Sequence, residues 1–321
     1  MRRRSVSITG ATGFVGWHLV EGFRDAGWDV RAIVRPGSAK ALPEGVTRVE
    51  AALDVEELAR ALEGSEVLVH AAAVTRGRGD APFESTNVEG TRRAVAAANR
   101  LGLRLVHISS LAAAGTGTVQ RPVREEDPPH PLTPYGRSKL AAEAIVRTTA
   151  TVPWTIVRPS AVYGPRDRGF LPLFRMASRG RFVLPGRPET PFTLIYIDDL
   201  TRALIAAADE PRAAGQTLFL GHPVASTAAE ILKGLAAAYE RPYRPLRLPG
   251  PLVVLAAVAG ELQWLVGGEP MIDRSRLAEL RAAGFVCAVD RARERLGFTA
   301  SVALDEGLVR TARWYAANGW L

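Results

Sequence analysis

Short apolar runs alternate with amphipathic stretches along the first half of the chain. The apolar runs predict buried strands at residues 5–8, 29–34, 46–49, 66–70, 103–108 and 154–157. Between them, apolar positions recur at helical spacing, which predicts helices that end near 26 and that cover 55–62, 87–100 and 135–150. Strands that alternate with helices in this way are typical of an α/β fold with a doubly wound parallel sheet.

The pattern changes after residue 159. Proline, glycine and arginine cluster between residues 164 and 191, around one short predicted helix at 170–178. The segment 192–197 predicts a return to the sheet with a helix after it, and 217–220 predicts a further strand.

Beyond residue 221 the chain is mostly helical, with predicted helices at 226–240, 252–266, 275–282 and 304–317. We therefore expect two parts. The sheet domain is formed by residues 1–165 with 192–221. The smaller, mostly helical lobe is formed by 166–191 with 222–321, and we expect it to bind the substrate.

A glycine-rich turn separates the first predicted strand from the first helix. It reads Thr-Gly-Ala-Thr-Gly-Phe-Val-Gly over residues 9–16. Glycines let the backbone approach a pyrophosphate, which sits on the N-terminus of the following helix. The sheet domain is thus predicted to be a Rossmann dinucleotide-binding domain, with contacts from Gly10, Thr12, Gly13, Phe14, Val15 and Gly16. The spacing is GxxGxxG rather than GxGxxG, and a tight turn without a ligand is the alternative reading.

The end of the second strand indicates which cofactor binds. Enzymes that prefer NAD usually place an acidic residue there for the ribose hydroxyls, whereas this chain has Val34 followed by Arg35. An arginine can pair with a 2′-phosphate and stack on adenine. We therefore predict NADP as the cofactor and NAD as the less favoured one. The alternative is that Arg35 is a solvated loop residue.

Three further positions fit a bound dinucleotide. Asp54 is predicted to cap the helix at 55–62 and could also face the adenine. The strand at 66–70 ends in Ala71, Ala72 and Ala73, whose small side chains would let a cofactor lie close. His70 is interpreted as a residue that fills the end of the strand.

Tyr135 and Lys139 are four residues apart at the start of a predicted helix, so their side chains share one helix face. An ammonium group near a phenol should draw its pKa from about 10 toward neutrality, which makes Tyr135 a candidate general acid and base. Ser110 follows the strand at 103–108, so both residues should lie at the carboxyl ends of strands, where ligands bind. The alternative is a surface pair at a helix N-terminus.

The chain resembles an extended short-chain dehydrogenase/reductase. The matching segments are 9–16, 70–73, 87–91, 109–110, 135–139, 158–159, 162–165 and 197–199, in the family's order. The resemblance implies that Ser110, Tyr135 and Lys139 are catalytic. It also implies that Val55, Asn87, Pro159, Ala161 and Val162 lie at the cofactor, together with Tyr135 and Lys139.

Departures from the family's patterns separate its chemistries. The sugar-nucleotide 4,6-dehydratases carry an Asp–Glu pair beside the catalytic hydroxyl, where this chain has Leu111 and Ala112. The nucleotide-sugar epimerases usually have asparagine at the place of Ala161, and tend to have arginine at the place of Pro191. The second strand and the C-terminal half look most like the dihydroflavonol reductases and the 3β-hydroxysteroid dehydrogenase-like proteins.

The motifs predict one function and leave two alternatives. We expect an NADP(H)-preferring oxidoreductase that interconverts a ketone and a secondary alcohol on a largely apolar small-molecule substrate. The alternative is a nucleotide-sugar 4-epimerase with tightly bound NAD. A scaffold that binds the cofactor but has lost catalysis is disfavoured, because Ser110, Tyr135 and Lys139 are all present.

Composition and charge bear on which ligands and partners the chain can bind. The net charge is +8, but the arginines are scattered and form no finger, basic zipper or aromatic–basic ladder, so we predict no nucleic-acid partner. Arginines crowd residues 166–187, either as a solvated face or to meet a phosphorylated substrate. The single cysteine, Cys287, excludes an intramolecular disulfide and a cysteine metal cluster, and no metal is predicted.

Hydropathy bears on location. The apolar run after Arg4 is too short for a signal peptide, and the longest apolar segment, 251–267, is too interrupted to span a membrane. We expect a cytoplasmic enzyme. The apolar helix near 251–266 could line a substrate pocket, rest on a membrane surface or pack in the core. Members of the family that this chain resembles often dimerise through two helices of each subunit, which makes the helices at 85–100 and 138–150 the candidates for a homodimer interface.

Overall fold

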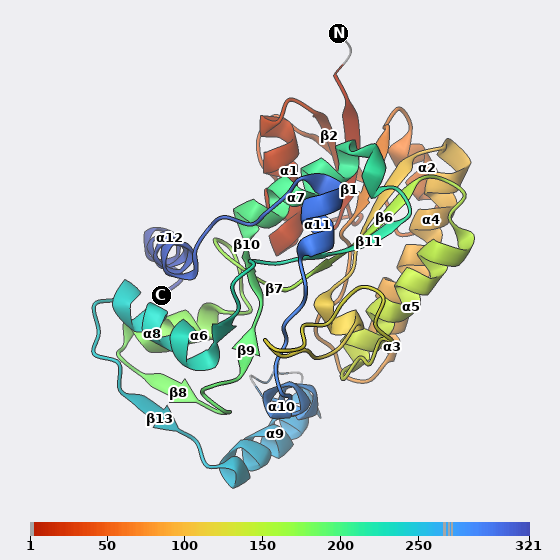
Figure 1. Ribbon diagram of the computed structural model, residues 1–321. Coiled ribbons are helices and arrows are strands. Elements are labelled where there is room, and N and C mark those ends of the chain that lie inside the picture. Colours follow the sequence, from red (N-terminus) through yellow and green to blue (C-terminus); the bar gives the residue numbers. More distant parts are fainter. Residues whose placement is uncertain (1–2, 266–267, 269, 271) are drawn as a thin grey trace.

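The computed structural model describes residues 3–265, 268, 270 and 272–321. A seven-stranded parallel sheet occupies the upper right of Figure 1, in the strand order β11-β6-β5-β4-β1-β2-β3. Its strands are β1 (Ser5–Thr9), β2 (Asp29–Val34), β3 (Thr47–Glu50), β4 (Val67–His70), β5 (Arg104–Ile108), β6 (Trp154–Pro159) and β11 (Gln216–Leu220). The order reverses at β1, which lies between β2 and β4. The predicted doubly wound α/β sheet is confirmed.

Helices cover both faces of this sheet (Figure 1). The first layer contains α1 (Phe14–Asp25), α7 (Ile197–Asp209) and α11 (Asp290–Leu296). The second contains α2 (Val55–Leu62), α4 (Glu89–Leu101) and α5 (Pro134–Thr149). Each layer has its own buried apolar cluster, with Leu19 and Leu204 in one and Leu58 and Val146 in the other. Burial of large aliphatic side chains on both faces fits the continuous apolar runs of the strands.

Local sequence explains how these helices begin. Asp54 caps α2, because its side chain accepts hydrogen bonds from the backbone N–H groups of Glu56 and Glu57. Thr133 caps α5 in the same way through the N–H of Gly136, and Pro134 occupies the first turn, where no N–H is needed. The caps fix the positions of the residues that follow them.

A smaller lobe lies at the lower left of Figure 1. Its helices are α6 (Leu171–Ser178), α8 (Ala228–Ala238), α9 (Gly250–Leu265), α10 (Arg274–Arg281) and α12 (Leu304–Ala317). Three two-stranded sheets lie outside the central sheet: β7 (Ala161–Tyr163) with β10 (Leu194–Tyr196), β9 (Pro191–Phe192) with β12 (Ser226–Thr227), and β8 (Phe182–Leu184) with β13 (Pro245–Arg247). Short elements complete the chain: α3 (Ala81–Phe83), the π-helical η1 (Glu84–Val88), and the 3-10 turns η2 (Leu111–Ala113) and η3 (Pro211–Ala213).

The prediction that 192–197 returns to the central sheet is wrong. Leu194–Tyr196 pairs in parallel with Ala161–Tyr163, in a separate two-stranded sheet. The physical reason is that the edge beside β6 is occupied by β11, whose residues pair in register with 155–159. The sequence pattern reports a buried strand but does not report its neighbour.

Other elements also differ from the sequence prediction. Asn87 lies in the π-helical turn η1, and the regular helix begins two residues later at Glu89. The helix α11 was not predicted, because its seven residues are mostly charged and show no apolar period. The predicted helix 252–266 corresponds to α9, which begins two residues earlier, and residue 266 lies outside the described residues. Residues 1–2, at the beginning of the basic N-terminal stretch, also lie outside the described residues. Within the described residues, every helix is too short or too polar to cross a membrane.

Candidate active site

The carboxyl ends of the parallel strands bring most of the predicted site residues to one edge of the sheet. Gly10 follows β1, Ala71 follows β4, and Ser110 follows β5 after one residue. Pro159 ends β6, and Ala161 and Val162 lie on β7 directly after it. Ligands of open α/β sheets bind at this edge, beside the strand where the order reverses.

The glycine-rich turn is built for a close approach of backbone segments. Gly10 has a positive φ of 69°, and a Cβ there would lie 2.7 Å from the backbone nitrogen of Ala72. A Cβ on Gly16 would collide with the carbonyl oxygen of Gly10. The turn and the segment after β4 are therefore in direct contact, as the small residues at 71–73 indicate.

The N-terminus of α1 fits a pyrophosphate. Gly13 is the capping residue and is exposed, and as a glycine it has no side chain to accept hydrogen bonds from the first N–H groups of the helix. Its neighbours Thr12, Phe14 and Val15 are partly exposed. Backbone N–H groups at such an end bind anions and are helped by the helix dipole. The residues present thus match a dinucleotide cofactor.

At the end of β2, Arg35 is exposed and Val34 is buried. The loop that follows is held by other residues: the Gly37 N–H donates to Glu50 at 3.1 Å, and Arg48 donates to the carbonyl oxygens of Ser38 and Lys40. Among the described residues, the guanidinium of Arg35 makes no ion pair, so its charge is available to a ligand. Asp54 and Val55 lie at the start of α2, where Asp54 is the capping residue.

Lys139 is buried, with 1% of its surface exposed, on the first turns of α5. Its Nζ donates a hydrogen bond to the carbonyl oxygen of Ile108 at 2.6 Å. Burial lowers the pKa of Lys139 to about 8, and the charge of Glu143 partly offsets this effect. A buried lysine tied to the end of β5 is a fixed group rather than part of a surface pair.

Tyr135 differs from the sequence expectation in one respect. Burial raises the pKa of Tyr135 to about 12, and a side-chain hydrogen bond with Ser110 acts in the opposite direction. The expectation that Lys139 draws this pKa toward neutrality is wrong for this structure, because desolvation of the phenol outweighs its neighbours. The hydrogen bond nevertheless brings Tyr135 and Ser110 together, as the resemblance implies. Ser110 also accepts a hydrogen bond from the Ala112 N–H at 3.1 Å.

Asn87 is completely buried and ties three segments together. Its side-chain oxygen accepts from the Val74 N–H at 2.8 Å, and its side-chain nitrogen donates to the Val74 carbonyl and to Ser138 Oγ, both at 2.9 Å. Ser138 precedes Lys139 on α5. Asn87 therefore positions the segment after β4 against the helix that carries Tyr135.

A buried ionic cluster, which the sequence pattern does not predict, lies one turn beyond Lys139 on α5. Both carboxylate oxygens of Glu143 accept hydrogen bonds from Arg158 at 2.8 Å, and Ser109 and Arg147 donate to them as well. Burial alone would raise the pKa of Glu143, but the hydrogen bonds and charges of Arg158, with Ser109 and Arg147, hold it below its usual value. The signal was the spacing of Glu143, four residues after Lys139.

Two buried histidines form a second pair that the sequence pattern does not predict. His70 on β4 and His107 on β5 are neighbours in the sheet register and stack with ring centroids 5.7 Å apart. Nδ1 of His70 lies 2.8 Å from Thr9 Oγ1, whereas neither ring nitrogen of His107 has a partner among the described residues. Burial, with the charge of Lys139, lowers the pKa of both histidines, to about 3 for His70, so both are neutral.

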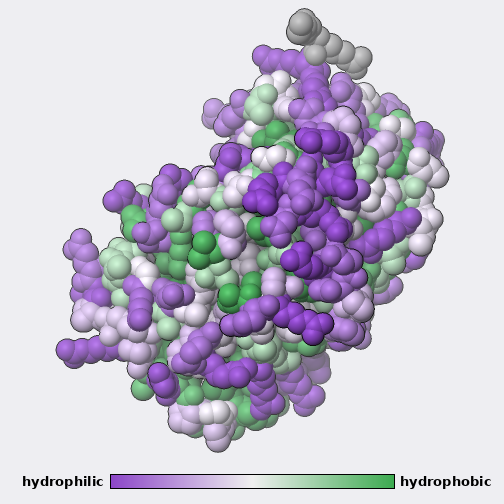
Figure 2. All heavy atoms as spheres, viewed as in Figure 1, coloured by the Kyte–Doolittle hydropathy of each residue, from purple (hydrophilic) through white to green (hydrophobic). Residues whose placement is uncertain are grey.

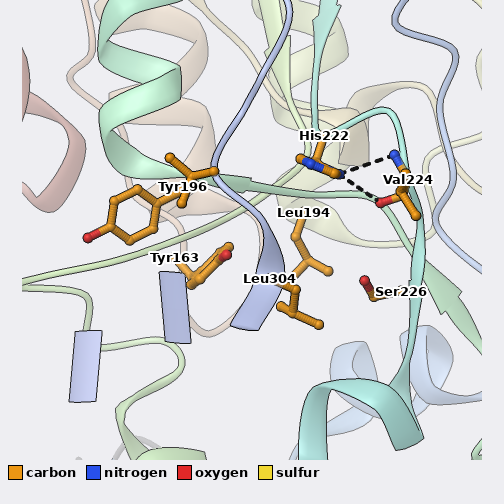
Figure 3. Close-up of a pocket in the computed structure, with 8 residues that line it drawn as sticks. Tyr163, Leu194, Tyr196, His222, Val224, Ser226 and Leu304 are labelled. Carbon is orange, nitrogen blue, oxygen red and sulfur yellow. Dashed lines mark hydrogen bonds between the residues drawn. The ribbon is translucent and has the colours of Figure 1, made fainter. Parts of the chain in front are cut away.

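A small pocket lies beside β7, β10 and the start of α12 (Figure 3). It is lined by side chains from β7, β10, the segment after β11 and the start of α12, including Tyr163, Leu194 and Leu304. His222 in its wall interacts with the backbone of Val224 at 3.2 Å. Ser110, Tyr135 and Lys139 are not among its lining residues. The pocket is thus separate from the candidate active site.

Three curated relatives match nearly the whole chain. A ceramide reductase from Caulobacter vibrioides is 32% identical, over 99% of this chain and 96% of its own. The 4-hydroxy-2-methyl-3-oxo-4-farnesyl-3,4-dihydroquinoline-1-oxide ketoreductase of Stigmatella aurantiaca is 30% identical, over 94% and 93%. A UDP-glucose 4-epimerase from Vibrio cholerae is 29% identical, over 97% and 95%.

The fold is also that of a solved enzyme structure. MoeE5 in complex with UDP-glucuronic acid and NAD superposes with a TM-score of 0.78 and is 26% identical, over 98% of this chain and 99% of MoeE5. Residues 6–221, which contain the glycine-rich turn, Ser110, Tyr135 and Lys139, match the family model described as the NAD dependent epimerase/dehydratase family. The chain is therefore an enzyme of the NAD dependent epimerase/dehydratase family, a group of extended short-chain dehydrogenases/reductases that use a pyridine nucleotide.

Proposed function

We propose that the protein is an NADP(H)-preferring oxidoreductase that interconverts a ketone and a secondary alcohol on a largely apolar small molecule. The observation that carries this proposal is Ala161. It lies half-buried on β7, immediately after the strand end that faces the cofactor edge, and its methyl group offers no hydrogen bond to a sugar-nucleotide diphosphate. An apolar residue there suits a substrate without phosphates.

In the reductive direction, Tyr135 donates its proton to the carbonyl oxygen, which Ser110 holds by a hydrogen bond. The pKa of Tyr135, raised to about 12 by burial, keeps the phenol protonated and ready to act as an acid. Lys139 is held in place by Ile108 and would reach the ribose of the nicotinamide half. The bound nicotinamide supplies the hydride.

The relatives support the apolar substrate class. Ceramide and a farnesyl-bearing quinoline both carry long hydrocarbon chains, and the two relatives are named as reductases of these molecules. Their identities of 32% and 30% exceed the 29% of the UDP-glucose 4-epimerase only by a narrow margin. The relatives therefore support an apolar substrate mainly because their named substrates fit the apolar side chain of Ala161.

The preference for NADP rests on the end of β2. Arg35 is exposed there with a charge that no described carboxylate neutralises, and Val34 replaces the acidic residue that would bind a 2′-hydroxyl. A 2′-phosphate would gain a charge-assisted hydrogen bond from the guanidinium.

The second candidate is a nucleotide-sugar 4-epimerase with tightly held NAD. It is favoured by the structural match to MoeE5, which binds UDP-glucuronic acid and NAD, and by the Vibrio cholerae epimerase. The arginines around Arg166 and Arg168 could meet its diphosphate. A cytoplasmic location, a homodimer and the assignment of residues 166–191 and 222–321 to substrate binding remain predictions.

Calorimetric titration of cofactor-stripped protein distinguishes the two candidates. NADPH, NADH, UDP-glucose and UDP-galactose are titrated separately. Tight NADPH binding with no heat from either sugar nucleotide is the expected result, and it leads to turnover assays with long-chain ketones. Binding of a sugar nucleotide, or NAD that cannot be stripped from the purified protein, would put the epimerase first.

A further inference from the structure

The outer face of α9 exposes large apolar side chains. Leu252, Leu255, Val258 and Leu262 are 51%, 64%, 50% and 60% exposed, and they recur along the helix at spacings of three and four residues. Leu246, on the strand that leads into the helix, is 62% exposed. Green and pale spheres gather at this end of the molecule, at the bottom of Figure 2. We call Leu252, Leu255, Val258 and Leu262 the α9 face.

The opposite side of the same helix is packed. Val253 and Ala257 are buried, and Gly260 lies so close to the carbonyl oxygen of Ile272 that a Cβ would not fit. α10 packs against α9 (Figure 1). The helix therefore keeps a fixed orientation, with one side held by the protein and the α9 face turned outward.

Basic residues predominate on the segment that leads into α9, whereas Glu240 precedes this segment and Glu261, next to Leu262 on the helix, accepts a hydrogen bond from the Arg274 N–H. Residues 241–260 contain Arg241, Arg244 and Arg247 but no aspartate or glutamate. All three arginines are exposed, and in the described part of the chain none of them pairs with a carboxylate. Basic residues beside an apolar helical face are the combination that binds anionic lipid surfaces, with the apolar side chains in the acyl boundary and the arginines at the phosphates.

The size of the face argues against a second copy of the chain as its occupant. A helix of this length is about 24 Å long and about 10 Å wide, so the face covers roughly 240 Å². A stable interface needs about 800 Å² on each partner. Binding to a bilayer surface scales with the apolar area inserted and with the attraction of basic side chains to anionic lipids, and it needs no complementary protein patch of that size.

We propose that α9 is a peripheral membrane-docking element that lies in the plane of an anionic lipid surface. The α9 face inserts into the headgroup region, and Arg244 and Arg247 contact lipid phosphates. The proposal rests on the exposed leucines and the surrounding charge, and it holds whichever reaction the enzyme catalyses.

The test is co-sedimentation of the full chain with vesicles. One set contains phosphatidylcholine alone, and the other contains phosphatidylcholine with one-third phosphatidylglycerol. We expect binding to the anionic vesicles that weakens at high salt. The double variant Leu255→Gln/Leu262→Gln should lower the partition coefficient by about tenfold or more, because two inserted leucines are lost. Arg244→Gln/Arg247→Gln should remove the preference for phosphatidylglycerol.

The matched control is Leu132→Gln/Leu321→Gln, which changes two exposed leucines outside the α9 face and should leave vesicle binding intact. All substituted side chains are exposed, and circular dichroism verifies that each variant is folded. Absence of binding by the native chain, or equal loss in the control, would overturn the proposal. A concentration-dependent dimer that the α9 variant abolishes, without vesicle binding, would assign the face to a second copy instead.

Discussion

Arg158 donates hydrogen bonds to both carboxylate oxygens of Glu143, each at 2.8 Å, and both side chains are almost completely buried. The pair joins β6, which carries Arg158, to α5, where Glu143 lies one helical turn after Lys139. A buried pair of this kind leaves an uncompensated charge when one partner is removed. It therefore couples the stability of the fold to the charge state of the candidate active site.

Glu143→Gln tests this coupling. We expect the free energy of unfolding to fall by about 3 kcal/mol, because Arg158 would be left buried without its counter-ion. The pKa of Lys139 should also fall below its value of about 8, because the charge of Glu143 is one of the influences that raise it. Chemical denaturation measures the first effect. A shift of the alkaline limb of the reduction rate to lower pH measures the second.

The control for this experiment is Glu56→Gln, which removes an exposed carboxylate that pairs with Arg100 at 2.7 Å. An exposed ion pair contributes little, so neither stability nor the pH profile should change measurably. If Glu143→Gln behaved like this control, the network would have no role in positioning Lys139.

Tyr135→Phe removes the candidate acid while keeping the ring that packs against Phe83. We expect kcat for ketone reduction to fall by at least about a hundredfold, because a positioned general acid contributes at least that much. The Kd for NADPH, measured by fluorescence titration, should change little. Equal loss of turnover and cofactor binding would mean that Tyr135 is structural.

The pH dependence should differ between the two directions of the reaction. Lys139 has a pKa of about 8, so it is charged at pH 7 and mostly neutral at pH 9. Tyr135 stays protonated up to about pH 12. Reduction needs the phenol and should fall above about pH 8 as Lys139 loses its charge. Oxidation needs the phenolate and should be favoured as pH rises.

Measurement of kcat/KM in both directions between pH 6 and 10 checks this prediction. Lys139→Arg serves as the internal comparison, because a guanidinium stays charged and should remove the alkaline limb of any remaining reduction activity. A reduction rate that increases from pH 7 to pH 9 contradicts the requirement for a charged Lys139.

The sequence predicted the central sheet well, because its signals are local. The strand 29–34 and the helix 55–62 coincide with β2 and α2, and Asp54 caps α2 as its position indicates. The glycine-rich turn is equally local: Gly10 and Gly16 are required by backbone contacts that a strand, turn and helix always make in this order.

The parts that could not be predicted depend on contacts between distant segments. Nothing in residues 192–197 tells which strand they pair with, and the choice is made by β11 at the sheet edge. The pairing of Glu143 with Arg158 requires the register between α5 and β6. The pKa of Tyr135 depends on how far the fold removes the phenol from water. The spacing between Tyr135 and Lys139 in the sequence gives no information on this.

Arg35→Ala tests the cofactor preference. If Arg35 binds the 2′-phosphate, its loss should weaken NADPH by about tenfold or more, since a charge-assisted hydrogen bond is lost, and should leave NADH nearly unchanged. Calorimetry with both nucleotides gives the ratio directly. Arg313→Ala, which removes an exposed arginine on α12, is the control. An unchanged ratio of the two affinities in Arg35→Ala would remove this residue from the cofactor site.

Gly10→Ala and Gly27→Ala form a matched pair that isolates the close contact beneath the cofactor cradle. Both glycines have positive φ, at 69° and 83°, so an alanine at either position carries similar backbone strain, about 1–2 kcal/mol. At Gly27 no described atom lies within 4 Å of a Cβ, whereas at Gly10 the Cβ would lie 2.7 Å from the Ala72 nitrogen. We expect Gly10→Ala to lose clearly more stability in thermal unfolding than Gly27→Ala.

The two variants should also differ in cofactor binding. A Cβ at Gly10 must push the turn away from the segment after β4, which moves the N-terminus of α1 that would receive the pyrophosphate. NADPH affinity should therefore fall in Gly10→Ala and stay unchanged in Gly27→Ala, as measured by calorimetry at a temperature where both variants are folded. If both variants bound NADPH like the native protein, the glycine-rich turn would serve the packing of β1, α1 and β4 and not the cofactor.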